Sequence, residues 1–112
     1  MRRDDELLRD ILDAIEAVGR FTQGRTRDDL DRDELLTAAL IQKIILIGEA
    51  AASVSERKRQ STTDIPWRQM IGMRKLVVHR YWRVDPAELW RTVQHDLPDL
   101  ADRLCDAQRD AS

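Results

Sequence analysis

Glycine and proline are scarce in this sequence, and no segment has the pattern of a β-strand. The chain has four glycines and three prolines among its 112 residues, whereas Ala, Leu, Ile, Arg, Asp and Glu are abundant. Because glycine and proline interrupt helices most strongly, their scarcity favours a helical protein. No segment alternates apolar and polar residues as a half-buried strand does. We therefore expect an all-α fold.

Cysteine is almost absent. The single residue, Cys105, excludes an internal disulfide and fits a protein of the reducing cytoplasm. Its place in a C-terminal apolar pattern predicts that it packs in the core. The His, Cys and carboxylate residues do not show the spacing of metal ligands, and the sequence has no glycine-rich phosphate loop. We expect neither a metal ion nor a cofactor.

Long apolar runs are missing too. The longest one, around residues 44–47, is far shorter than the roughly 20 residues that a membrane span needs. Arg2 and Arg3 are followed at once by acidic residues, so no signal peptide is expected. These features predict a cytoplasmic protein that makes no use of a membrane.

Helical periodicity with recognisable ends is present instead. Apolar residues at spacings of three and four predict a helix over residues 4–22, with Gly24 as its stop. Asp31 or Asp33 can cap a second helix that runs to about Glu56. The polar residues 53–63 that overlap its end are expected to form a loop.

Three further helices are expected in the second half of the chain. One covers residues 67–80, a second begins at Asp85-Pro86, and Pro98 restarts the chain for a third that ends near Ala107. With 112 residues the chain is long enough for one core. We predict a single domain over residues 1–112, an antiparallel bundle of four to five helices.

The predicted helix after Asp33 is apolar around much of its circumference. Such a helix is central, or it packs against a partner subunit as well as its own core. Gly48 and the alanines at residues 50–52 would let another helix approach closely. Contact with a second subunit and packing within one chain both explain these small residues.

Positive charge is concentrated in one segment, although the formal net charge is only −2. Residues 57–83 hold eight Lys and Arg residues against one acidic residue, Asp64, and the flanking segments are acidic. A local positive field concentrates anions and can steer a polyanion to one face. A solvated basic surface that pairs with the acidic helices is the alternative interpretation.

Arg74, His79 and Tyr81 lie within this basic segment and have side chains suited to a phosphodiester. Arginine matches phosphate geometry, and histidine exchanges protons near neutral pH. On a regular helix, however, His79 lies about 140° around the axis from Arg74. The two converge only if the helix loosens near His79, or if the same helix of a second subunit faces it across a two-fold axis.

A resemblance to a known family is carried by residues 65–85, IPWRQMIGMRKLVVHRYWRVD, with IGEAA at residues 47–51 and VQHDLP at residues 93–98. Within this segment four residues separate Arg74 from His79, and one residue separates His79 from Tyr81. In this context the spacing resembles the motif of the HepT-like toxins, which belong to the HEPN group of small helical ribonucleases. The resemblance covers essentially the whole chain.

The resemblance implies a HEPN-like homodimer with a composite cleft that cleaves RNA without a metal ion. Arg74 and His79 would be the catalytic pair of this toxin. Tyr81 would be the site where a minimal nucleotidyltransferase antitoxin attaches AMP. Many HEPN motifs have a polar uncharged or acidic residue after the arginine, whereas this chain has Lys75. The lysine either reduces activity or supplies a further phosphate contact.

Several other side chains have two interpretations. Arg80 and Arg83 either guide RNA or form a solvated helix face, and His95 is interpreted as structural. The three tryptophans could stack on bases, but their helical setting favours packing in the core or at an interface; they are Trp67, Trp82 and Trp90. The alternative function is a catalytically weak helical module that binds a nucleotide or a nucleotidyltransferase partner.

Overall fold

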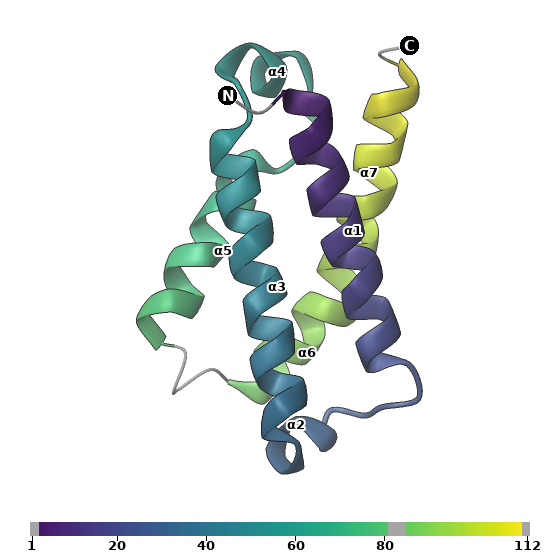
Figure 1. Ribbon diagram of the computed structural model, residues 1–112, viewed down its shortest axis with the longest axis vertical. Helices are drawn as coiled ribbons and strands as arrows, with labels where there is room; N and C mark the ends of the chain where they lie inside the picture. The colour runs from purple at the N-terminus through teal and green to yellow at the C-terminus, as the bar shows by residue number, and fades with distance from the viewer. Residues whose placement is uncertain (1–2, 81–84, 111–112) are drawn as a thin grey trace.

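The computed structural model describes residues 3–80 and 85–110, with side chains except at residues 75–80 and 110, and all its regular elements there are helical (Figure 1). In chain order they are α1 (Asp4–Thr22), α2 (Asp29–Arg32), α3 (Glu34–Ser53), α4 (Glu56–Ser61), α5 (Trp67–Arg80), α6 (Pro86–Arg91), the π-helical turn η2 (Thr92–Asp96) and α7 (Leu97–Asp110). The prediction of an all-α fold is confirmed.

The long helices run antiparallel. Figure 1 shows α1 and α5 descending from the end that holds both termini, while α3 and α7 rise toward it. Helix α3 packs against α1 on one side and α5 on the other, and α7 packs against α1. The joined segment α6, η2 and α7 completes a four-rod bundle of the predicted kind.

Helix α1 forms as its apolar spacing predicts. Leu8, Ile11 and Val18 lie on its buried stripe, and acidic residues occupy its first turn, where they stabilise the positive helix end. The helix ends at Thr22, and Gly24 then adopts a positive φ of 73°, a conformation that glycine adopts without strain. Both predicted ends of this helix are confirmed.

Helix α3 begins at the second of its two candidate caps. The Asp33 carboxylate accepts a hydrogen bond of 3.0 Å from the backbone N–H of Leu36, whereas Asp31 lies inside α2. The helix ends at Ser53, a few residues before the predicted end at Glu56. Capping by Asp33 also fixes the direction in which α3 leaves α2.

The apolar part of α3 is longer than the short run at residues 44–47 suggests. Its whole length, Glu34–Ser53, is long and apolar enough to cross a membrane by length and composition, which corrects the sequence-based expectation. The core helix of a soluble protein passes the same test. In this bundle Leu40, Ile44 and Ile47 are almost completely buried between α1 and α5, so α3 has the position of a core helix.

Helix α4 corrects the prediction of a loop over residues 53–63. The Ser55 hydroxyl caps it by accepting a hydrogen bond from the Lys58 N–H, and Asp4 of α1 accepts hydrogen bonds from both the N–H and the hydroxyl of Ser55. These hydrogen bonds from Ser55, with a smaller contribution from the charge of Lys58, lower the pKa of Asp4. Helix α4 has no buried residues, so it lacks the apolar stripe that would have predicted it.

The C-terminal rod corrects further predictions. Pro98 lies in the first turn of α7, as predicted, but the π-helical turn η2 leads into α7 without a break, and α7 runs to Asp110 instead of ending near Ala107. At this turn the Leu97 N–H donates to the carbonyl of Thr92, five residues earlier, and the next residue, Pro98, has no N–H to place. Cys105 is exposed, because the buried stripe of α7 passes through its neighbour Leu104.

Candidate functional site

The beginning of α5 is tied to the rest of the bundle. The Trp67 indole N–H lies 3.2 Å from the carbonyl oxygen of Thr62 and 3.0 Å from its hydroxyl. On the other side of the same loop, Arg103 of α7 donates a 2.7 Å hydrogen bond to the Asp64 carbonyl. Met70, one turn into α5, is 1% exposed. Trp67 and Met70 therefore fix the first half of the helix that carries Arg74.

Gly48 marks the place where α3 and α5 approach most tightly at the site. A Cβ atom added at Gly48 would lie 2.5 Å from Cβ of Arg74, closer than two carbon atoms can pack, and 3.1 Å from the Met70 carbonyl oxygen, which is also a tight contact. The close approach predicted from the small residues of α3 is confirmed, and the helix that approaches belongs to the same chain. The absence of a side chain at Gly48 thus sets the position of the Arg74 backbone.

Four candidate site residues lie on α5. Arg74, Lys75, His79 and Arg80 all fall within the helix, and Arg74 is partly buried. Tyr81, Arg83 and Trp82 lie outside the described residues. Because α5 remains α-helical through Arg80, the helix does not loosen at His79. On this regular helix Arg74 and His79 lie on different sides of the axis.

The described cations of the basic segment make no ion pairs with described residues. The ion pairs found use other arginines, such as Arg25 and Arg103. Lys58 attracts the Asp4 carboxylate only at longer range, as the pKa of Asp4 records. Among the described residues, Arg59, Arg68 and Arg74 therefore have no ion-pair partner on the acidic helices. Arg68 is exposed, as a solvated basic surface predicts.

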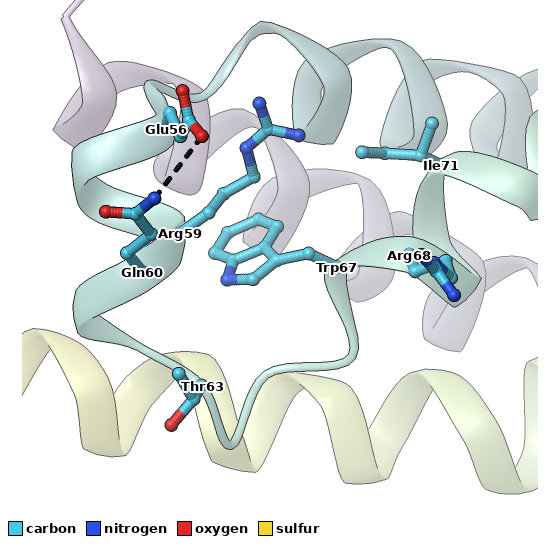
Figure 2. A pocket seen from close by; sticks show the side chains of 7 residues that line it. All are labelled: Glu56, Arg59, Gln60, Thr63, Trp67, Arg68 and Ile71. Atoms are coloured by element: carbon cyan, nitrogen blue, oxygen red, sulfur yellow. Dashed lines mark hydrogen bonds between the residues drawn. The ribbon is translucent and has the colours of Figure 1, made fainter.

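A hollow of about 520 Å³ opens between α4 and the first half of α5. Figure 2 shows its lining: Glu56, Arg59, Gln60, Thr63, Trp67, Arg68 and Ile71. Sequence reasoning missed this site because one of its walls is α4. The signal that could have revealed α4 is Ser55, a favoured N-cap residue placed just before Glu56.

Two of the three tryptophans and His95 lie within the described residues. Trp67 is 7% exposed and packs in the core, and the small part of it that stays exposed lines the hollow. Trp90 is partly buried against the core, so packing is confirmed for both. His95 is exposed in η2, on a different element from α5. Among the described residues no group of three His, Cys, Asp or Glu side chains is placed to hold a metal ion.

Known proteins resemble this chain over most of its length. The family model "Ribonuclease HepT-like" matches residues 11–106. A Thermococcus cleftensis protein named "Probable ribonuclease HepT" is 35% identical, over 88% of this chain and 90% of its own length. A Methanocaldococcus jannaschii protein named "Putative RNase" is 29% identical, over 83% of this chain and 85% of its own length.

A second protein of the same archaeon, named "Gamma-glutamylcyclotransferase and putative RNase", is 32% identical over 93% of this chain. The chain spans only 47% of that longer relative. No solved structure matches the chain. The family model covers both Gly48 and the whole of α5, the two parts that meet at Arg74. The chain belongs to the HepT-like ribonuclease family of the HEPN group.

Proposed function

We propose that the protein is a metal-independent endoribonuclease and the toxin of a type II toxin-antitoxin system in the cytoplasm, built as one HEPN-like domain over residues 1–112. The observation that carries the proposal is the setting of Arg74. It is held at the crossing of α3 and α5, has no ion-pair partner among the described residues, and shares its helix with His79 in a chain of a ribonuclease family.

The proposed reaction assigns one role to each residue. The ribose 2′-hydroxyl loses a proton as it attacks the adjacent phosphorus, and the leaving 5′-oxygen gains one. His79 transfers a proton in this exchange, and general acid-base catalysis of this kind typically contributes about 10² to 10⁴ in rate. Arg74 stabilises the negative charge that develops on the phosphoryl oxygens, an effect worth roughly 3 to 4 kcal/mol for one well-placed donor.

The active unit is a homodimer in which two α5 helices form one cleft. The regular helix through Arg80 supports it, because Arg74 and His79 of one chain lie on different sides of the axis. Helix α3 also has an incompletely covered surface: Leu35 is 83% exposed, and only 44% of its most apolar window is buried. A two-fold partner would cover such a surface and bring the second Arg74 and His79 into reach.

Regulation involves a cognate minimal nucleotidyltransferase that attaches AMP to Tyr81. The added group would place bulk and negative charge near Arg74, so it would block the cleft and compete for the guanidinium. Lys75, Arg80 and Arg83 are the proposed additional contacts to RNA phosphates. Family membership and the concentration of basic residues in this segment support these roles.

Cleavage of RNA by purified protein in the presence of a chelator tests the catalytic assignment. We expect wild type to cleave and His79→Ala to lose about 10² to 10⁴ in rate. The matched control is His95→Ala, which removes the other histidine, exposed in η2, and should leave the rate unchanged. Equal activity of wild type and His79→Ala, with the oligomeric state preserved, would contradict the assignment.

Mixed subunits test the composite cleft. Arg74→Ala and His79→Ala proteins should each be inactive, whereas refolding them together should restore part of the activity. The mixed dimer has one intact Arg74 and one intact His79 in the same cleft. No recovery in a mixture shown to contain mixed dimers would mean that the two residues of one chain act together.

A catalytically weak module that binds a nucleotide or a nucleotidyltransferase is the second candidate. Lys75 favours it, because the lysine departs from the family motif directly after the arginine. Growth arrest on expression without the partner, relieved by Arg74→Ala, would rule out this second candidate.

A further inference from the structure

The hollow between α4 and α5 is lined by two arginines and one acidic residue, so its lining has a net positive charge. Arg59 Nε is buried and makes no hydrogen bond to a described residue, and Arg68 makes no ion pair with one. Glu56 is the acidic residue of the lining, and its carboxylate already accepts a 3.3 Å hydrogen bond from Gln60. The Nε atom itself is closed to solvent, so an external anion would meet the outer nitrogens of the guanidinium, where charge-assisted hydrogen bonds are strong.

The floor of the hollow is apolar and fixed. Trp67 is held by its two hydrogen bonds to Thr62, and Ile71 lies one turn further along α5. Figure 2 shows the Arg59 side chain extending past the Trp67 ring, with Ile71 on the other side of the same space. An aromatic and aliphatic floor beside guanidinium groups suits a ligand with a flat ring and a phosphate, which is the chemistry of a nucleotide.

Arg68 in the lining of the hollow lies on the side of α5 that carries position 79 of the proposed active site, not on the side that carries Arg74. Positions 68, 75 and 79 fall within about 40° of one another around the axis of a regular helix, and roughly 16 Å separates the first from the last along it. A strand bound in the hollow at Arg68 would therefore run along one stripe of α5 toward position 79. A duplex would not present an unstacked base to such a floor, whereas a single strand would.

We infer that the hollow lined by Arg59, Trp67, Arg68 and Ile71 is a binding subsite for one nucleotide of a single-stranded RNA substrate, a few nucleotides from the bond that is cut. The two arginines bind its phosphate and the Trp67–Ile71 floor receives its base. The inference rests on the proposed ribonuclease function, and it adds that the substrate is unpaired over this segment.

Binding of a fluorescent single-stranded RNA tests the subsite separately from catalysis. The probe is 2′-O-methylated throughout, so it lacks the attacking hydroxyl and stays intact whichever residues are catalytic. Anisotropy titrations at several salt concentrations would compare wild type with Arg59→Gln, Arg68→Gln and the double variant. We expect the affinity of the double variant to be lower by about tenfold or more. The slope of the logarithm of its binding constant against the logarithm of the salt concentration should be smaller in magnitude by about one to two.

Arg57→Gln is the matched control, because Arg57 is an exposed cation of α4 that does not line the hollow. It should change the affinity by less than about twofold. Wild type should also prefer the single strand to the same strand paired with its complement, and the double variant should lose most of this preference. Arg68 is exposed, so Arg68→Gln remains informative even if Arg59→Gln impairs folding.

Several results would overturn the subsite. One is equal affinity of the double variant and Arg57→Gln, and another is a wild-type preference for the duplex. A third is a double variant that binds RNA normally but no longer binds its nucleotidyltransferase partner, which would assign the hollow to a protein. Cleavage by wild type is measured in parallel: if wild type does not cleave RNA, the proposed function fails while the binding data still decide the subsite.

Discussion

Arg25 and Arg59 each bury a guanidinium Nε that makes no hydrogen bond to any described residue, but their surroundings differ. At the corner between α1 and α3, Arg25 Nη2 donates a 2.5 Å hydrogen bond to Asp33, and its Nε lies 3.6 Å from an Asp29 oxygen. Between α4 and α5, Arg59 has no such carboxylate, and the nearby Glu56 is bound to Gln60.

The difference separates a structural arginine from one that is free to bind a ligand. The two carboxylates around Arg25 satisfy its charge inside the fold, and one of them also caps α3. Around Arg59 the fold supplies an apolar floor, and no described carboxylate lies within ion-pair distance of the guanidinium. Arg74 resembles Arg59 in this respect, since it also lacks an ion-pair partner among the described residues. The predictions below test this contrast.

The largest effect is expected when the charge at the proposed catalytic arginine is removed. Arg74→Gln should reduce the rate of RNA cleavage by about 10²- to 10³-fold, because one donor to the developing phosphoryl charge is lost. Its thermal midpoint should change little. Arg25→Gln should do the opposite, with normal cleavage and a loss of stability on the order of 1 kcal/mol. Cleavage assays and thermal denaturation of both variants measure these effects. An equal loss of activity in Arg74→Gln and Arg25→Gln would contradict the distinction between the two arginines.

A smaller effect is expected when the position of Arg74 is disturbed but its charge is kept. Gly48→Ala adds a methyl group where the Arg74 Cβ and the Met70 carbonyl leave no room, so α3 and α5 must separate. Overpacking of this kind costs about 1 to 3 kcal/mol, and the shift of Arg74 should lower the cleavage rate as well. Urea denaturation and initial cleavage rates measure the two effects.

Gly19→Ala is the control for this substitution. Gly19 is also helical, but a Cβ atom added there would meet nothing within 4 Å. Replacing it by alanine should stabilise α1 by about 0.5 to 1 kcal/mol and leave cleavage unchanged. If Gly48→Ala behaved in the same way, the close crossing would have no role in placing Arg74.

The smallest effect is expected when the charge of Asp33, the carboxylate that accepts a hydrogen bond from Arg25, is removed. The hydrogen bond from the Leu36 N–H, followed by the one from Arg25, lowers the pKa of Asp33 below its usual 3.8. The ionised carboxylate therefore stabilises the fold above the unfolded pKa, and this contribution is lost as the pH falls through 3.8 toward the lower folded value. Asp33→Asn keeps a favourable cap without the charge.

We expect Asp33→Asn to show a shallower loss of stability than wild type between about pH 5 and pH 3 in urea denaturation. Arg59→Gln should retain the wild-type pH dependence, because no carboxylate pairs with Arg59 among the described residues. A shallower slope in Arg59→Gln would mean that Arg59 too is a structural arginine.

The parts of the fold that the sequence predicted well are those with a strong local signal. The bounds of α1 and α5 matched, because an apolar stripe in one and Ile65-Pro66 before the other mark them clearly. Helix α4 was missed because it has no apolar stripe, so its local signal is limited to the cap residue Ser55, and the hydrogen bonds that hold Ser55 come from the distant Asp4. At Pro98 the local rule predicted a break, but the π-helical turn before it accommodates the proline.

The candidate site was predictable only in part for the same reason. The family motif names Arg74 and His79 as catalytic candidates, which stays a prediction, whereas the close helix approach indicated by the small residues of α3 is confirmed. That Gly48 meets Arg74 itself could not be read from the sequence, because it depends on the register between α3 and α5. The hollow at Arg59 was hidden because it needs both α4 and α5 in place.

The hydrogen bonds between Asp4 and Ser55 have a consequence for the order in which the protein folds. They join residues 51 positions apart, and α4, with six residues, is too short to be stable by itself. We therefore expect α4 to persist only once α1 has docked on the bundle. A chain in which α1 is undocked would then have its basic residues but no ordered wall at Arg59.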